Sequence, residues 1–520
     1  MMVRVLRAVA AAAAVVGATL AAPATTAAGA TSTVAGAYPF AITSPSVLTG
    51  PSPFSACPIG AVAGSVASPN AEVEPWLDVD PTSGSVVAVW QQDRWSDGGA
   101  RALGTTTSAD GTTWERPRFV PWSLCAGGGP PAGDFPRVSD PWVSFGPDGV
   151  GYQVALGLNQ QFPFNESAVT ASRSLDGGRS WQAPTVILRE PLVAAPFPMN
   201  DKESVTADPT RPGRAYVVWD RVRFPSQHEA LQGASSSFFE ARSFRADAML
   251  SRTLDGGTSW EPARSIMPTN ANLATIDNQV AVAGDGTLVD LFKGGKGAGD
   301  QPAELTFIGA LRSTDAGQTW SRVRKIAEAP SVQVRDPDDG EPVRALTNLD
   351  IAADLTRPGT LYAVWSDGRF SGGVRNDIVF TRSTDGGLSW SPPSRINQTP
   401  PTANPLDGQA FLPSVAVSSD GTIGVFYYDF RFNSPDPRTL PTAAFLVHSH
   451  DGGRSWVEDQ LAAPFDLQTA PVTPAGLFIG DCEGLAASGR DFVTVFAITN
   501  SGDLGNRTDI VAVRANVLTP

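Results

Sequence analysis

Four arginines share one pattern, in which an aromatic residue ends an apolar run and the arginine lies four residues further on. The four pairs are Trp90 and Arg94, Trp219 and Arg223, Trp365 and Arg369, and Tyr427 and Arg431. Each pair has an acidic residue between or beside it: Asp93, Asp220, Asp367 and Asp429. A guanidinium is a rigid fork of donors that suits a carboxylate. The pattern therefore predicts either arginines that bind an anion or arginine–aspartate pairs that hold the ends of repeated strands.

Acidic residues open a second set of segments, which are expected to be short strands. These segments begin Glu74-Pro75, Asp140-Pro141, Asp201-Lys202-Glu203, Asp277-Asn278, Asn348-Leu349-Asp350 and Asp481-Cys482-Glu483. Carboxyl groups that lie close together push one another's pKa values apart, and acid–base catalysis needs such a difference. This set therefore supplies candidates for proton transfer.

A short motif that ends in tryptophan recurs six times and shows which elements position these residues. Its aspartates are Asp110, Asp176, Asp255, Asp315, Asp385 and Asp451, and its tryptophans are Trp114, Trp181, Trp260, Trp320, Trp390 and Trp456. The carboxylate can cap nearby backbone N–H groups, and the glycines that follow accept positive φ. A β-rich run precedes each motif, so each is expected to be a hairpin turn within a repeated unit.

The six motifs resemble the Asp-box (BNR) repeat of sialidases and related β-propeller proteins. The resemblance covers most of the chain and implies a propeller in which the six repeat aspartates are structural. Each unit has a first strand, an apolar second strand, a third strand that leads into the motif and a fourth strand after the tryptophan. Loops that join strand two to three, and strand four to the next strand one, lie opposite the motifs and would carry the site.

Seven apolar second strands can be counted, although only six units carry the motif. They are 86–90, 151–156, 216–219, 288–292, 362–365, 425–427 and 492–496. The last unit stops one strand short, and the β-like segment 37–43 is expected to complete it. We therefore predict an all-β, seven-bladed β-propeller of four-stranded blades, closed by an N-terminal strand. A six-bladed propeller would result if the unit at Gly151 or the last unit were irregular.

The resemblance also implies roles for individual residues. In sialidases three arginines hold the carboxylate of sialic acid, an aspartate is the acid/base and a tyrosine–glutamate pair is the nucleophile. Carried over, the substrate-binding arginines would come from Arg94, Arg223, Arg369 and Arg431. Tyr428 would be the nucleophile, Glu203 or Glu483 would polarise it, and Asp140 or Asp201 would be the acid/base. The Phe/Tyr-Arg-Ile-Pro segment of sialidases is absent, and the nearest string, Asp134-Phe-Pro-Arg137-Val, is reordered.

These residues lead to three functional hypotheses. The first is a secreted sialidase-like glycoside hydrolase that acts on an acidic glycan terminus at the channel mouth. The second is another carbohydrate-active propeller, either a polysaccharide lyase or a different glycosidase. The third is a non-catalytic exported propeller that binds a glycan or a protein. All three are expected to be monomers without a cofactor.

Composition and the N-terminus indicate the compartment. Arg4, Arg7 and the apolar run 8–20 form a secretory signal over residues 1–28, which leaves 29–520 as a single propeller domain. No other stretch is apolar enough to span a membrane, and a net charge of -14 argues against nucleic acid. Of three cysteines, Cys57 and Cys125 are the preferred disulfide pair, with Cys482 left over. No metal site is predicted, although the loop 335–341 could bind calcium if it is not simply solvated.

Overall fold

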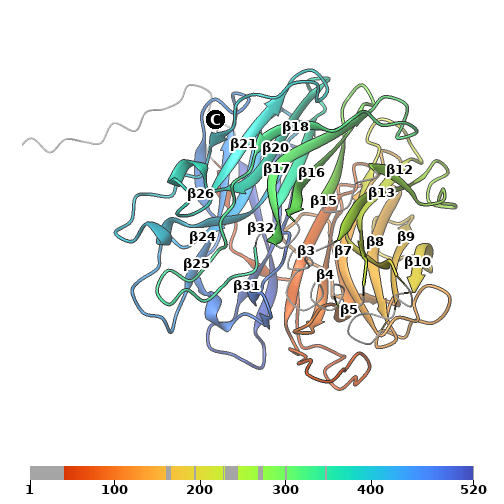
Figure 1. Ribbon diagram of the computed structural model, residues 1–520, viewed down its shortest axis with the longest axis horizontal. Helices are drawn as coiled ribbons and strands as arrows, with labels where there is room; N and C mark the ends of the chain where they lie inside the picture. Colours follow the sequence, from red (N-terminus) through yellow and green to blue (C-terminus); the bar gives the residue numbers. More distant parts are fainter. Residues whose placement is uncertain are drawn as a thin grey trace, which may run out of the picture. The chain divides into compact units, whose positions relative to one another are not determined.

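The computed structural model describes residues 40–518 except for 160–165, 192–194, 227, 229–243, 268–272, 299–300 and 346–347. All described residues belong to a compact unit that spans residues 37–520. The expected secretory signal, residues 1–28, lies outside the described residues. Regular structure in this unit is almost entirely β-strand, which confirms the predicted all-β class (Figure 1). The helical elements with described bounds are short 3₁₀ turns: η2 (Arg369–Ser371), η3 (Pro405–Gly408) and η4 (Leu467–Thr469).

Antiparallel runs of four strands, consecutive in the sequence, recur along the chain. The first two runs share one sheet and are joined by a single residue pair, Ala100 with Val138. Their strands are β3 (Glu72–Val79), β4 (Val86–Arg94), β5 (Ala100–Ser108), β6 (Arg118–Val120), β7 (Arg137–Phe145), β8 (Gly151–Asn159), β9 (Glu166–Ser174) and β10 (Thr185–Pro191). The next sheet consists of β11 (Phe197–Ala207), β12 (Ala215–Phe224), β13 (Arg245–Thr253) and β14 (Arg264–Met267).

Three further sheets repeat the same order. One contains β15 (Leu273–Val282), β16 (Leu288–Ala298), β17 (Gln301–Ser313) and β18 (Arg324–Glu328). The next contains β19 (Leu349–Asp354), β20 (Thr360–Asp367), β21 (Asp377–Ser383) and β22 (Ser394–Arg395). The third contains β23 (Ala410–Val417), β24 (Ile423–Asp429), β25 (Pro441–Ser449) and β26 (Val457–Gln460), with β27 (Phe465–Asp466) on β25. A small hairpin, β28 (Val472–Thr473) and β29 (Gly476–Leu477), follows.

The last sheet is completed from the N-terminal side of the unit. It contains β30 (Gly484–Ser488), β31 (Asp491–Thr499), β32 (Thr508–Val517) and β1 (Phe40–Ile42), and β2 (Ser46–Val47) also pairs with β32. β1 is antiparallel to β32, with Phe40 opposite Val517. The sequence predicted this pairing of the segment 37–43 with the last strand, which would otherwise present an unpaired edge.

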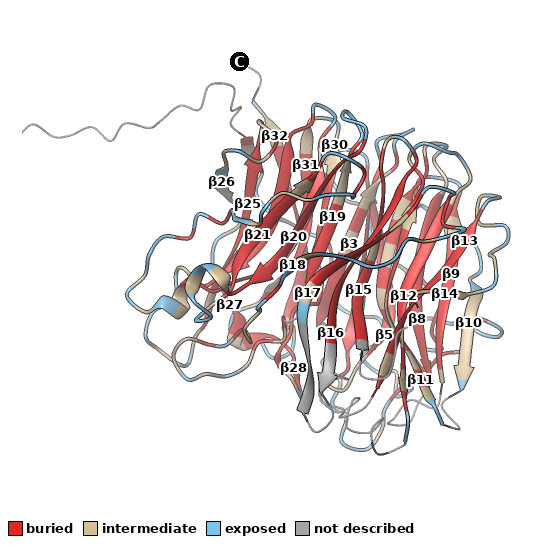
Figure 2. Cartoon of the chain, turned by 45° about the horizontal axis from the view of Figure 1, so that its top comes forward, coloured by how far each residue is buried: buried red, intermediate tan, exposed pale blue. Residues whose placement is uncertain are grey.

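The core lies between neighbouring sheets. Tyr152 and Val169 of one sheet, for example, pack with Val217 and Trp219 of the next. The strands are accordingly buried along most of their length, while exposed residues gather in the loops (Figure 2). The six motif tryptophans each pack against one of these apolar clusters. The repeated Trp thus anchors a turn to the core that two sheets share.

The first strand of each run contacts the first strand of the next run. β3 contacts β7, and the same relation continues through β11, β15, β19, β23 and β30. β30 in turn contacts β3, and the sheets succeed one another in chain order in Figure 1. We call β3, β7, β11, β15, β19, β23 and β30 the first strands. Residues of these strands line two cavities, one of which is the site described below.

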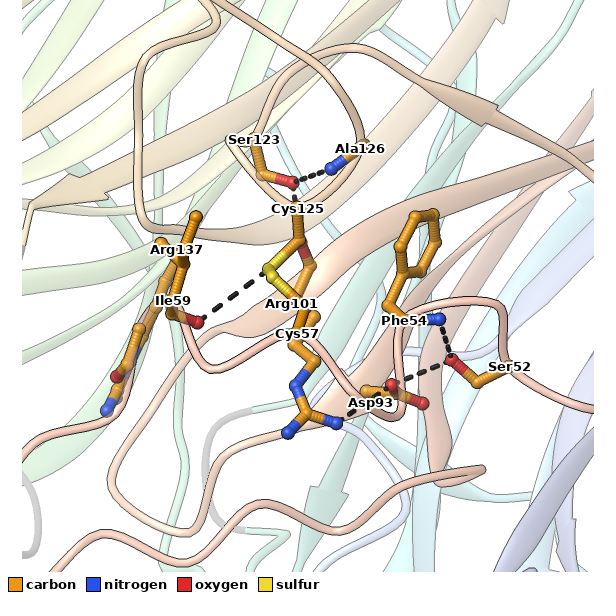
Figure 3. The surroundings of a disulfide bond; sticks show 11 residues. Ser52, Phe54, Cys57, Ile59, Asp93, Arg101, Ser123, Cys125, Ala126 and Arg137 are labelled. Carbon is orange, nitrogen blue, oxygen red and sulfur yellow. Dashed lines mark hydrogen bonds and ion pairs between the residues drawn. A yellow bond between two sulfur atoms is a disulfide. The ribbon is translucent and has the colours of Figure 1, made fainter.

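A disulfide ties two loops outside the strands together. Cys57 and Cys125 are bonded, with their Cα atoms 6.0 Å apart, which confirms the preferred pairing. Around the bond in Figure 3, Ser123 Oγ donates to the backbone oxygen of Arg101 at 2.5 Å, and Arg101 Nη1 pairs with Asp93 at 3.2 Å. Cys482 takes part in no disulfide. The bond therefore fixes the loop before β3 against the segment between β6 and β7.

Candidate functional site

Five of the first strands bulge at the same place, and residues of these bulges line one cavity. The register of each strand with its second strand shifts at this point. One residue in each bulge has a left-handed backbone: Glu74 (φ 53), Asp140 (φ 51), Lys202 (φ 55), Asp277 (φ 57) and Leu412 (φ 56). Such a conformation is strained for residues other than glycine and is common at functional sites. Four of these five residues carry a charged side chain, so the strained backbone coincides with candidate functional residues.

A cavity at this level, which we call the acidic pocket, is lined largely by carboxyl groups. Its acidic lining residues are Glu74, Asp140, Glu203, Asp277, Asp350, Asp481 and Glu483, and its one basic lining residue is Lys202. The cavity volume is ≈ 40 Å³, which is room for a water-sized group. A second cavity of ≈ 320 Å³ lies further along the first strands and shares Trp76 and Trp142 with the acidic pocket.

Asp481 is the centre of an ion network in the acidic pocket. Lys202 Nζ and Arg344 Nη2 each lie 2.5 Å from Asp481 Oδ2, and Lys202 Nζ is 3.9 Å from Glu74 Oε1. The guanidiniums of Arg94 and Arg344 also lie over the ring of Phe478, at 4.8 and 4.6 Å from its centroid. Both cations closest to the pocket are therefore already neutralised by one carboxylate of the protein.

Burial and charge separate the pKa values of these acids. Burial, aided by Asp140, raises the pKa of Glu74 to about 8 and raises that of Glu203 well above its usual range. Burial also raises the pKa of Glu483. Burial alone would raise the pKa of Asp481 too, but Arg344 and Lys202 hold it well below its usual range. At neutral pH the pocket thus contains both protonated and ionised carboxyl groups.

Two tryptophans form the aromatic part of the wall. Trp76 and Trp142 are stacked, with ring centroids 3.5 Å apart and an interplanar angle of 24°. Both are half-buried, and each follows an acid–proline pair, Glu74-Pro75 and Asp140-Pro141. Stacked indole faces offer a flat apolar surface beside the polar groups. The repeated acid-Pro-Trp string is a signal in the sequence that could have located this wall.

Three of the predicted catalytic residues line the acidic pocket, and two do not. Asp140, Glu203 and Glu483 are in its wall. Asp201 is the neighbour of Lys202 but does not line the pocket, and burial raises its pKa to about 6. Tyr428 is fully buried among Phe411, Phe426 and Phe465, and its hydroxyl donates to the backbone oxygen of Ala497 at 2.8 Å.

Tyr428 is therefore placed for packing and not for attack on a substrate. Burial and the neighbouring carboxyl of Glu483 raise its pKa well above the usual range, whereas a nucleophile needs its ionised form to be accessible. Both predicted partners, Glu203 and Glu483, line the pocket, and Glu483 is the one that lies beside Tyr428.

The four predicted arginines do not meet in the acidic pocket. Arg223 pairs with Asp247 of β13, Arg369 lies 2.6 Å from Asp367, and Arg431 lies 2.7 Å from Asp429 and 2.6 Å from Glu458. None of these three lines the pocket. Their contacts agree with the alternative in which a repeated arginine holds the end of its own sheet.

Arg94 is the exception among the four. It is buried behind the pocket, and its Nη1 donates to Gln91 Oε1 at 2.8 Å. Gln91 in turn donates to Asp140 Oδ1 at 3.3 Å. Arg94 thus belongs to the shell around the acidic pocket, together with Arg344, which follows no repeat pattern and was not predicted from the sequence.

The six repeat aspartates lie on turns between third and fourth strands, away from the acidic pocket. Asp176 shows the arrangement: Oδ1 accepts from Ser180 N at 2.8 Å, and Oδ2 accepts from Ser180 Oγ at 2.6 Å. Equivalent bonds form at Asp255, Asp315, Asp385 and Asp451, and Asp110 accepts from Thr112 N and Thr113 N. Their carboxylates are used within the turns, in agreement with a structural role.

The described residues contain no cluster of three or more His, Cys, Asp or Glu side chains arranged to hold a metal ion. In the loop 335–341, Asp336 accepts hydrogen bonds from Asp338 N at 2.8 Å and from Gln468 Nε2 at 2.7 Å. Asp338 in turn accepts from Asn433 and from Asp436 N. Within the same described part of the chain, no helix is long and apolar enough to cross a membrane.

Comparison with known proteins gives one partial sequence match. No protein-family model matches the chain. A sialidase of Bacteroides fragilis (strain YCH46) is 29% identical over 213 residues, which is 37% of this chain and 37% of that protein. The chain thus spans little more than a third of the length of the curated relative that it matches.

Several solved structures also resemble the chain at low identity. A protein of unknown function from Dyadobacter fermentans has a TM-score of 0.44 and 12% identity, and the match covers 89% of this chain and 100% of that one. The Hadza microbial sialidase Hz136 has a TM-score of 0.42 and 18% identity, and the match covers 70% of this chain and 64% of that one. An α-L-arabinanase of Penicillium chrysogenum has a TM-score of 0.43 and 12% identity, and the match covers 91% of this chain and 98% of that one.

Proposed function

We propose that the chain is a secreted glycoside hydrolase, built as a seven-bladed β-propeller with its active site in the acidic pocket. The blade count is supported by the recurrence of four-strand runs, by the succession of contacts among the first strands and by the return of β1 to β32. Two cavities along the first strands support a central channel. Export is supported by the signal-like N-terminus and by the disulfide, since disulfides persist in oxidising compartments.

The observation that carries this proposal is the difference in pKa between neighbouring carboxyl groups in one cavity. Most glycosidases use one protonated carboxyl to protonate the leaving oxygen and one carboxylate to activate water or attack the sugar. Glu74, with its pKa near 8, is the proton donor. Asp140 is assigned as the base from its position alone, because it lines the pocket and its Oδ1 accepts a hydrogen bond from Ser139 Oγ at 2.5 Å. Trp76 and Trp142 supply the surface on which a sugar ring rests.

Release of an acidic terminal sugar, as a sialidase performs it, is the first candidate reaction. It is supported by the partial similarity to the Bacteroides fragilis sialidase. Lys202, Arg344 and Arg94 gather around Asp481 and Glu74, so a substrate carboxylate that displaced Asp481 would meet cations there. In this arrangement the cations differ from the repeated arginines that the family resemblance implies.

Hydrolysis of a glycan without a carboxylate is the second candidate. It is favoured by the pairing of Arg223, Arg369 and Arg431 within their own sheets and by the excess of acids over bases in the acidic pocket. Such a substrate would bind through its hydroxyl groups and need no guanidinium.

The test is hydrolysis of a panel of fluorogenic glycosides, including a sialoside and neutral and amino sugars, by the purified protein. For the substrate that is turned over, Glu74→Gln and Asp140→Asn should each lower kcat by about 10²-fold or more, because they remove the proton donor and the base. Arg369→Lys, which keeps a positive charge beside Asp367, is the control. Activity should fall as the pH rises through about 8, where Glu74 loses its proton.

The outcomes separate the hypotheses. Turnover of only the sialoside supports the first candidate, and turnover of only other glycosides supports the second. If no glycoside is hydrolysed, or if Glu74→Gln retains full kcat, the acidic pocket is not the active site of a glycosidase, and a lyase or a binding propeller takes its place.

A further inference from the structure

Three buried glutamates in the wall of the acidic pocket present oxygens that no donor of the protein reaches. They are Oε1 and Oε2 of Glu203, Oε2 of Glu74 and Oε1 of Glu483. These side chains are only 2%, 2% and 1% exposed. A buried acceptor without a partner costs on the order of 1–3 kcal/mol, so native proteins usually satisfy it with a ligand or water.

The unsatisfied groups of this wall are all of one kind. Asn278 and Asn348 add two side-chain carbonyl oxygens without a donor to those of the glutamates. Among the described residues that line the pocket, no buried side-chain nitrogen lacks an acceptor. Lys202, the one basic lining residue, already pairs with Asp481. A ligand that complements these oxygens must therefore donate hydrogen bonds, and a positive charge on it would be balanced by a glutamate that ionises as the ligand binds.

The size of the pocket limits the part of the ligand that enters. A cavity of ≈ 40 Å³ accepts a group of about the size of water, so one substituent of a sugar can enter while the ring and its glycosidic bond stay at the mouth, beside the lining residues Glu74 and Asp140. Trp76 and Trp142 lie in the same wall and can support a ring outside it. A metal ion would fit the size, but the described residues hold no set of three side chains arranged as metal ligands.

We propose that the acidic pocket binds the protonated primary amine of its ligand, with Glu203 as the principal acceptor and Glu74 and Glu483 beside it. An ammonium group has three donors, is close to water in size and is neutralised by a carboxylate. An amino sugar presents such a group on a ring that the two tryptophans can hold. Only the assignment of the amine to a sugar substrate rests on the proposed hydrolase function, because binding of the amine does not require hydrolysis.

Binding of an ammonium group is coupled to proton release. Burial raises the pKa of Glu203 well above its usual range and so favours its protonated form in the empty pocket. An ammonium ion favours the ionised carboxylate of Glu203, and this proton passes to the buffer as the ion binds, while Glu74 keeps its proton for the proposed reaction. A neutral amide or hydroxyl ligand would cause no such release.

The experiment is isothermal titration calorimetry of the purified protein at pH 7 with methyl glucosaminide. N-acetylated methyl glucosaminide, which has the same ring without the charge, is the matched ligand. The amine should bind at least 10-fold more tightly, and its apparent enthalpy should differ between buffers of different ionisation enthalpy because protons are released. Glu203→Gln should lower the affinity at least 10-fold, while Asp503→Asn, on an exposed loop, should leave it unchanged. Ethylamine, which lacks the ring, distinguishes a sugar site from a site for any primary amine.

Three results would overturn the amine site: equal affinity for the two glucosaminides, wild-type affinity in Glu203→Gln, or displacement of the amine by millimolar Ca²⁺. If Glu203→Gln does not fold, Glu483→Gln and the buffer dependence of the wild-type enthalpy test the same claim. Binding of the amine without turnover of any glycoside would keep the amine site and reject the hydrolase. Turnover of glycosides without preferential binding of the amine would keep the hydrolase and reject the amine site.

Discussion

At the scale of single residues, Glu74 makes the stability of the protein depend on pH. Its pKa is raised from an unfolded value near 4.5 to about 8, so between these values the folded chain keeps a proton that the unfolded chain has lost. The free energy of unfolding must therefore fall as the pH rises through this range. Glu74→Gln removes this dependence. Between pH 5 and pH 9 the free energy of unfolding of this variant should rise relative to that of the wild type by on the order of a few kcal/mol, as measured by urea denaturation. If the free energies of unfolding of the two proteins changed with pH in parallel, Glu74 would not be the source of the pH dependence.

The arginines show why the sequence located charged residues correctly but not their partners. Their spacing after an aromatic residue placed Arg369 and Arg431 at strand ends, where they are found. The same spacing recurs because each arginine pairs with an aspartate at the end of its own second strand, Asp367 or Asp429. The arginine repeat therefore does not locate the pocket. Lys202 occupies the bulge position that is acidic in three other first strands, Arg344 follows no repeat pattern, and only three-dimensional proximity joins these two cations at Asp481.

At the scale of elements, the repeat turns predict a matched pair of substitutions. The residue after the repeat aspartate has positive φ, 72° at Gly256 and 58° at Ala316. A Cβ at Gly256 would meet nothing closer than 3.9 Å, so Gly256→Ala should cost about 1 kcal/mol through the backbone alone. Ala316→Gly should stabilise, by less than this, because it also removes a buried methyl. Thermal unfolding of both variants checks the pair, and a stabilising Gly256→Ala would refute it.

The first strands mark the limit of what the sequence could predict at this scale. Alternation, turn residues and apolar second strands were enough to place the strands and the six turns. The bulges were not predicted, because a left-handed Glu74, Asp140 or Lys202 contradicts the local preference of these residues and depends on the surrounding structure. Each bulge also shifts the register of the strand. The acids could therefore be assigned to strand starts, but the choice of which acids line the pocket could not.

At the scale of the whole unit, the pairing of β1 with β32 should decide whether the last sheet is stable. β32 is apolar, and without β1 and β2 its backbone groups would lie at an open edge. The unpaired backbone groups of an open apolar edge strand can pair with another chain, so the molecule becomes prone to associate. A chain that begins at Ala37, where the compact unit begins, retains both strands and is the control. A chain that begins at Leu48 lacks them.

We expect the shorter chain to unfold at a lower temperature than the control and to form higher oligomers at micromolar concentration. Thermal unfolding and size-exclusion chromatography measure the two effects. Because β1 follows the pairing pattern of a fourth strand, adding a peptide of residues 37–47 in excess should restore part of the lost stability. Proline at Ala41, which faces Asn516 across the pair, should abolish that restoration because it removes a backbone donor. Equal melting temperatures for the two chains would mean that the last sheet is stable as three strands, and the closure that supports a seven-bladed ring would then lose its energetic basis.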